Sequence, residues 1–241
     1  MNNLEAFGIR PGNDKRHLIM AVNLQAEDFF RDAEVLLSDV ALTVLEQVVP
    51  NLEAHQGRWN AGGFMAFPLG MHDELGQLRL HVWPKGIERE NSEGPNIHNH
   101  AWLLSSRVLA GVYSDTLYRV EDHGIVTDKE LIKTEGLLQV FETRREPEGH
   151  NALITEGSFM KPIPILNRET PAERTNRTYL EMYHVTTVPV EQLAVTLILD
   201  SPALATTTKI LIDSARIKSG RSRKVIDLSE IVLAKEQIMH S

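Results

Sequence analysis

The chain contains no cysteine among its 241 residues. This absence excludes disulfide bonds, thiolate zinc sites, iron–sulfur clusters and a cysteine nucleophile. Any metal ion that the protein binds must therefore be held by histidine, carboxylate or water ligands.

The chain also lacks an excess of basic residues, because 25 Lys and Arg stand against 33 Asp and Glu and give a formal net charge of -8. A nucleic-acid binder needs a basic face to neutralise phosphates, so we expect no nucleic-acid partner. Five basic residues gather around Ser219-Gly220, and we interpret this segment as a solvated β-turn. They are Arg216, Lys218, Arg221, Arg223 and Lys224.

Targeting segments are missing as well. The first 17 residues have neither the basic start nor the apolar stretch of a signal peptide, and no run approaches membrane-spanning length. The sequence has no internal repeat, no low-complexity segment and no G-x-S-x-G elbow of a serine hydrolase. We expect a cytoplasmic protein with no membrane partner.

Two segments have the pattern of helices. Residues 26–49 place apolar side chains at three- and four-residue spacings, which predicts an amphipathic helix ended by Pro50. Asp227 and Glu230 form a capping pattern ahead of a second apolar stripe, which predicts a closing helix of about three turns. We predict that residues 1–60 form a helical extension packed on one main domain, residues 61–241.

The main domain consists of short apolar runs punctuated by Gly, Pro, Asn and Asp, with no strong helical pattern between them. Such a series predicts a mainly β fold, an antiparallel sandwich or barrel. Eight runs are expected to be strands: 62–69, 77–83, 100–111, 112–121, 136–144, 178–188, 193–200 and 206–213.

The segment with the clearest metal-binding pattern is His98-Asn99-His100, which follows the turn Gly94-Pro95. Side chains alternate between the faces of a β-strand, so both imidazoles are expected on one face. Nitrogen ligands of this kind suit Zn, Fe, Cu or Ni. The alternative is a pair of buried histidines satisfied by hydrogen bonds alone.

The strongest third ligand is His184, because it lies in a late run that is otherwise apolar and β-branched. His81 alternates with Arg79 on one face of an earlier strand. The other histidines lie in polar, turn-like or terminal sequence, and we predict that they face solvent: His17, His55, His72, His123, His150 and His240.

Residues 94–111, GPNIHNHAWLLSSRVLAG, resemble the first motif of the cupins, and His184 with the following LAVTLILDSP resembles the second. Among cupins the likeness is closest to thiol dioxygenases of the cysteine dioxygenase type, because LHVWPKG precedes the histidine pair. The resemblance implies a double-stranded β-helix, a jelly-roll barrel with one metal at its mouth. It also implies ferrous iron bound by His98, His100 and His184, with positions open for substrate and dioxygen.

The chain departs from those families at several positions. Leu104 and Ser105 stand where many cupins have a glutamate ligand, so a fourth carboxylate ligand is not expected. Ile198 and Asp200 stand where thiol dioxygenases have a functional His and Tyr. We therefore predict an iron-dependent oxygenase for a small polar molecule, such as an amino-acid derivative or thiol, without cysteine dioxygenase activity and with no assigned catalytic side chain.

Candidate substrate contacts follow from strand alternation. Arg79 and His81 either face the cavity and meet an acidic substrate or face solvent, because a buried cation needs an anionic partner. Trp102 is expected to face the same interior as His98 and His100, as an apolar wall or as plain core packing. Arg58 is an alternative to Arg79 for gripping a carboxylate. Residues 167–178, with Arg168, Arg174 and Arg177, are interpreted as an anion-binding lid or an exposed loop.

Two other functions remain open. One is a non-oxidative isomerase, lyase or hydrolase, in which Zn, Mn or Ni polarises a substrate oxygen. The other is a cupin that binds a small ligand without catalysis. The apolar face of the N-terminal helix and the tendency of cupins to pair through their sheets predict a homodimer.

Overall fold

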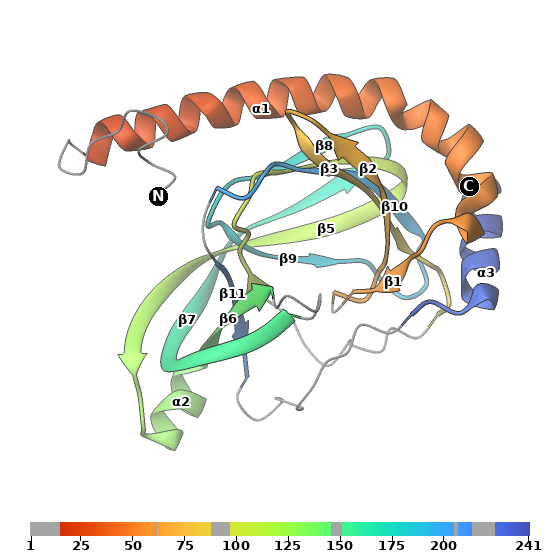
Figure 1. The fold of residues 1–241 in the computed structure, drawn as a ribbon. Helices are drawn as coiled ribbons and strands as arrows, with labels where there is room; N and C mark the ends of the chain where they lie inside the picture. Colours follow the sequence, from red (N-terminus) through yellow and green to blue (C-terminus); the bar gives the residue numbers. More distant parts are fainter. Residues whose placement is uncertain (1–14, 61, 88–96, 146–150, 205–206, 214–224) are drawn as a thin grey trace.

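The computed structural model describes residues 15–60, 62–87, 97–145, 151–204, 207–213 and 225–241. It shows a mainly antiparallel β protein with one helix at each end of the chain (Figure 1). The helical elements are α1 (Lys15–Thr43), the π-helical turn η2 (Val44–Val48), the 3-10 helix η3 (Val49–Ala54), α2 (Lys129–Glu135) and α3 (Leu228–Met239). The Gly94-Pro95 turn and the basic segment 216–224 lie outside the described residues.

The strands are β1 (Arg58–Trp59), β2 (Met65–His72), β3 (Gly76–Trp83), β4 (Ile97–His98), β5 (Leu104–Ile125), β6 (Leu138–Arg145), β7 (Asn151–Pro171), β8 (Thr175–Thr178), β9 (Tyr183–Thr187), β10 (Ala194–Asp200) and β11 (Thr208–Ile212). The first half of β5 pairs with β8 and β10, and its second half pairs with β7 and β9. The pairings β5-β7-β6-β11-β4-β9-β5 form a closed circuit. The short strand β4 closes it, where His98 lies opposite His184.

The second part of the sheet, β1-β2-β3-β10-β5, has an apolar face that packs under α1 and an opposite face that carries polar side chains. On one face of β10, Leu197 and Leu199 are fully buried in the same apolar cluster as Phe30 and Leu37 of α1. Because side chains alternate along a strand, Thr196 and the other intervening residues of β10 lie on the opposite face. Helix α1 therefore covers the outer face of this sheet and leaves the inner face for polar side chains (Figure 1).

Helix α1 is longer than predicted. It begins at Lys15 and passes into η2 and then into η3, where Asn51 leaves the helical conformation at a φ of -117° and a ψ of 27°. Pro50 lies in the first turn of η3, where its missing N–H costs no intrahelical hydrogen bond, and the helix kinks at the next residue, Asn51, close to the predicted end.

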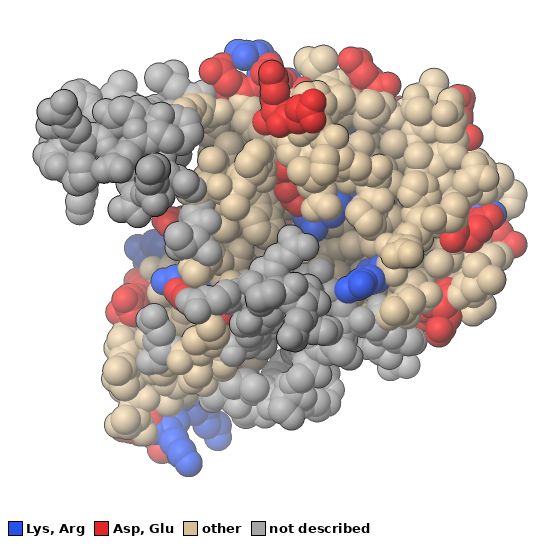
Figure 2. Space-filling view, viewed as in Figure 1, with Lys and Arg blue, Asp and Glu red and all other residues tan. Residues whose placement is uncertain are grey.

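The segment Gln25–Ala54 is long and apolar enough to cross a membrane by length and composition, with a mean hydropathy of 1.4 over its best window. The prediction that no run approaches that length was therefore wrong. The core helix of a water-soluble protein and a signal sequence pass the same test. Only 22% of this window is buried, although Phe30, Ala33 and Leu37 are fully buried in the same apolar cluster as residues of the sheet. Acidic side chains line the edge of the molecule that α1 occupies (Figure 2).

Several other sequence predictions can be compared with the structure. Residues 104–111 and the run 112–121 form one strand, β5, because Gly111 continues it at a φ of +72° where a Cβ would collide with the Leu193 carbonyl. Residues 100–103 of the first run lie outside the strands. Strand β7, strand β8 and helix α2 were not predicted, and the loop assigned to 167–178 is mostly β-strand. Helix α3 is confirmed, with its capping box between Asp227 and Glu230.

Candidate metal centre

The structure brings the three predicted ligands, His98, His100 and His184, together. One ring nitrogen from each lies within 4.8 Å of the other two, and Nε2 of His100 is 2.9 Å from Nε2 of His184. His100 and His184 are only 9% and 5% exposed. This cluster of imidazoles from two segments far apart in the sequence could hold a metal ion.

The backbone around Asn99 explains how two histidines of one short segment reach the same point. Strand β4 ends at His98, and Asn99 then pairs with Lys209 of β11. Its N–H donates to the Lys209 carbonyl at 3.0 Å, and its Oδ1 accepts from the Lys209 N–H at 2.6 Å. Asn99 is thereby directed away from the cluster, and His98 and His100 both reach it, as alternation predicts.

Asp115 on β5 supports the cluster and was not predicted. Its Oδ1 lies 2.7 Å from Nδ1 of His184, and its Oδ2 accepts a hydrogen bond from Nη2 of Arg168 at 2.9 Å. Burial would raise the pKa of this carboxyl group, but the His184 and Arg168 contacts outweigh burial and hold the pKa at about 2. A buried carboxylate therefore lies directly behind one of the three candidate ligands.

A second buried carboxylate lies near His100. Asp200 forms an ion pair with Arg79 and accepts a hydrogen bond from Nε1 of Trp102 at 3.1 Å. The Trp102 ring lies 5.2 Å from the His100 ring, between centroids. The sequence left Arg79 facing either an acidic substrate or solvent, whereas the structure supplies an anionic partner from the protein itself.

Burial raises the pKa of Asp200 to about 6, with Arg79 and Trp102 opposing the rise. The folded protein thus holds this proton more tightly than the unfolded chain, whose Asp pKa is about 3.9. The resulting stabilisation is complete below about pH 4 and is lost as the pH rises through about 6. The difference in unfolding free energy between the metal-free wild type and Asp200→Asn should therefore change with pH. As the pH rises from about 4 to above 6, the wild type should lose up to about 3 kcal/mol relative to the variant. Urea unfolding at a series of pH values measures this difference, and a constant difference would contradict it.

His81 is a fourth buried histidine, 6% exposed, on the inner face of β3. Its ring stacks on Phe64 at 4.2 Å, and Thr196 of β10 lies opposite it in the sheet register. Among the described residues, His81 Nε2, Thr196 Oγ1 and Arg79 Nε are buried without a hydrogen-bond partner. Burial, with a smaller contribution from Arg79, holds the pKa of His81 well below its ordinary value, so its ring is neutral.

His100 has the same electrostatic character. Burial is the main cause that lowers its pKa well below the ordinary value, and the neighbouring histidines, Arg79 and His81 add to the effect. Neutral imidazole is the form that binds a metal ion.

Other predicted residues lie elsewhere. Arg58 is exposed on β1 and pairs with Val225, so it is not part of the cluster. His72 is exposed at the turn after β2, where its Nδ1 accepts hydrogen bonds from the backbone N–H groups of Glu74 and Leu75. Arg177, assigned to a lid, instead forms ion pairs with acidic residues of α1.

A scan against protein-family models found no match, and a search of the curated proteins found no similar protein.

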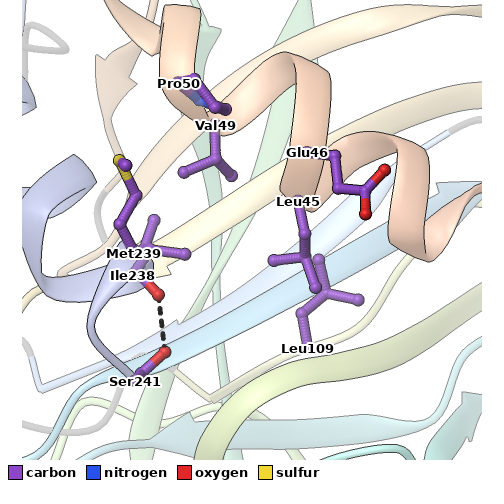
Figure 3. Close-up of a pocket in the computed structure, with 8 residues that line it drawn as sticks. All are labelled: Leu45, Glu46, Val49, Pro50, Leu109, Ile238, Met239 and Ser241. Carbon is purple, nitrogen blue, oxygen red and sulfur yellow. Dashed lines mark hydrogen bonds between the residues drawn. The ribbon is translucent and has the colours of Figure 1, made fainter.

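A separate pocket lies between η2, η3, β5 and α3, and none of the three histidines lines it (Figure 3). Glu46 is the only one of its lining residues with a titratable side chain. The other lining residues are Leu45, Val49, Pro50, Leu109, Ile238, Met239 and Ser241. This pocket offers no metal ligands comparable to the histidine cluster.

Proposed function

We propose that the protein is a non-haem, iron-dependent oxygenase of the cupin type that acts on a small polar molecule such as an amino-acid derivative or a thiol. The observation that carries the proposal is the convergence of three imidazole nitrogens from His98, His100 and His184. Nitrogen ligands of one metal ion lie ~3–4 Å apart, so the cluster needs little contraction to hold an ion. The closed circuit of antiparallel strands supports a jelly-roll barrel.

The three histidines would hold the ion and leave other coordination positions free. Ferrous iron bound there would supply open positions for a chelating substrate and dioxygen, and the electrons that activate dioxygen. Trp102 and Phe64 contribute apolar surface that limits the access of water. The protein's own contribution is thus ligand geometry, a dry pocket and placement of the substrate.

The unpartnered polar atoms beside the cluster would place that substrate. A buried polar group without a partner costs about 1–3 kcal/mol, which a bound ligand can offset. His81 Nε2, Thr196 Oγ1 and the remaining N–H of Arg79 can supply hydrogen bonds to an oxygen of the substrate.

The charges near the site favour an anionic substrate. Arg79 is balanced by Asp200 and Arg168 by Asp115, so neither cation leaves a negative charge free for a metal ion. Among the described residues that contact the cluster, no further carboxylate compensates a divalent ion. A substrate with a negatively charged metal-binding group would supply that compensation.

His81 also favours a second candidate function, a non-oxidative metal-dependent isomerase, lyase or hydrolase. Its neutral ring, with Nε2 unpartnered, could accept a substrate proton while Zn, Mn, Ni or Cu polarises a substrate oxygen. The oxygenase uses His81 only to bind the substrate.

Metal analysis after anaerobic purification, combined with oxygen uptake, separates these functions. We expect close to one iron per chain and oxygen consumption that depends on the added substrate, screened among small thiols and amino-acid derivatives. Zinc or manganese at the same stoichiometry, with turnover but no oxygen uptake, would overturn the oxygenase and support the second function. Metal binding with ligand binding but no turnover would indicate a ligand-binding protein.

A further inference from the structure

We propose that Asp115 is the positioning residue of the metal centre and that, together with Arg168 and Asn176, it fixes the tautomer and ring orientation of His184. This inference rests on the proposed metal site. None of these three supporting residues was a predicted ligand, and none belongs to the set of imidazoles that would touch the ion.

All four donors around Asp115 converge on a side chain that is 0% exposed. Oδ1 contacts Nδ1 of His184 at 2.7 Å and accepts from Oγ1 of Thr186 at 3.3 Å. Oδ2 accepts from Nη2 of Arg168 at 2.9 Å and from Nδ2 of Asn176 at 3.3 Å. With both oxygens held from several directions, the carboxylate cannot rotate away from His184.

This fixed carboxylate decides which nitrogen of His184 carries the hydrogen. An acceptor at Nδ1 requires the hydrogen on that atom, which leaves the lone pair of Nε2 free to bind a metal ion. The same contact sets the ring plane, so that Nε2 is directed at His100. The opposite tautomer would direct an N–H group at the ion and prevent coordination.

Support of this kind is unequal among the ligands. Nδ1 of His100 is buried and has no hydrogen-bond partner among the described residues. Compared with His100, His184 therefore has a ring orientation that a protein side chain fixes, and loosening Asp115 should affect metal binding through His184.

Strand β8 supplies a matched control for variants around Asp115, because adjacent side chains of this strand lie on opposite faces of the sheet. Asn176 is buried and contacts Asp115. Arg177 instead contacts Glu27 and Glu34 of α1, and its guanidinium lies over the Phe30 ring at 5.6 Å. A change of the Arg177 side chain perturbs the same strand without touching the carboxylate.

The test measures Co²⁺ binding by equilibrium dialysis of the full-length protein. Asp115→Asn is expected to raise the Kd for Co²⁺ about 10–100-fold, because an amide can direct its NH₂ group at Nδ1 and favour the wrong tautomer. Arg168→Gln, which leaves Asp115 in place but less firmly held, should raise it by a smaller factor. Arg177→Gln should leave the Kd within about twofold of wild type.

Proton NMR of the Co²⁺-loaded protein gives a readout that a merely structural role would not move. The wild type should show a hyperfine-shifted imidazole N–H resonance that exchanges slowly with solvent, from Nδ1 of His184. This resonance should be lost in Asp115→Asn at saturating Co²⁺.

The outcomes distinguish the two proposals. A wild type that binds no Co²⁺ overturns the metal site and this inference together. A wild type that binds Co²⁺, with unchanged affinity and resonance in Asp115→Asn, overturns only the role of Asp115. If Asp115→Asn fails to fold, Arg168→Gln decides, and an unchanged Kd and N–H exchange rate in that variant would contradict the proposal.

Discussion

Replacing His100 by alanine is expected to abolish stoichiometric metal binding. Loss of a residue that only supports a metal-bound histidine already costs about 10–100-fold in affinity, so loss of the ligand itself should cost at least about 100-fold. The cluster of ligand atoms found among the described residues consists of the three histidines, so this variant keeps only two of its three ligand nitrogens. Metal content after dialysis against a dilute solution of the ion measures the effect.

His72→Ala is the matched control for this variant. His72 is exposed at a turn, where its Nδ1 accepts hydrogen bonds from backbone N–H groups. Its removal should leave the metal content at the wild-type level. The ligand assignment would be wrong if His100→Ala retained its metal while the His72 variant lost it.

The ligands could be predicted from the sequence because their signal is local. His98 and His100 need only the alternation of an extended chain, and His184 needs only an apolar setting that suggests a buried strand. Asp115 and Arg168 carry no such signal. They meet because β5 pairs with β7 in a register that places them opposite each other, 53 residues apart in the sequence.

Arg79 shows how a correct physical rule can leave the partner undetermined. A buried cation does require an anion, and the sequence alone allowed either an acidic substrate as that anion or a solvent-facing Arg79. The structure supplies it as Asp200, which lies close to Arg79 only because β3 and β10 are neighbours. Long-range strand pairing, rather than residue chemistry, was the missing information.

In the fold, too, the elements with a local sequence signal were predicted, whereas those that depend on long-range strand pairing were not. The apolar periodicity of 26–49 and the capping box at Asp227 are local, and both helices are present. Strand β7 was missed although it spans 21 residues, because it lacks a strict alternation of apolar and polar side chains. Its residues from Ser158 to Pro164 pair with the far end of β5, which extends away from the rest of the sheet (Figure 1).

Phe30→Ala is expected to lower the free energy of unfolding by about 3–5 kcal/mol. Phe30 is fully buried, and its ring packs edge-on against Tyr179 at 4.8 Å between centroids. Truncation would leave a cavity between α1 and the sheet that the surrounding strands can fill only in part. Urea unfolding followed by tryptophan fluorescence measures the change.

The same experiment decides how α1 is used, since its segment is apolar enough to cross a membrane. Leu42→Ala is the control, because Leu42 lies on the same helix but is 62% exposed, and its loss should change stability by no more than about 0.5 kcal/mol. A helix that left the sheet for a lipid bilayer would make the two substitutions equivalent for the unfolding of the β domain in water. A large effect of Phe30→Ala beside a small effect of Leu42→Ala would instead show that α1 is held on the outer face of the sheet, directly behind the strands that carry Arg79, His81 and Asp200.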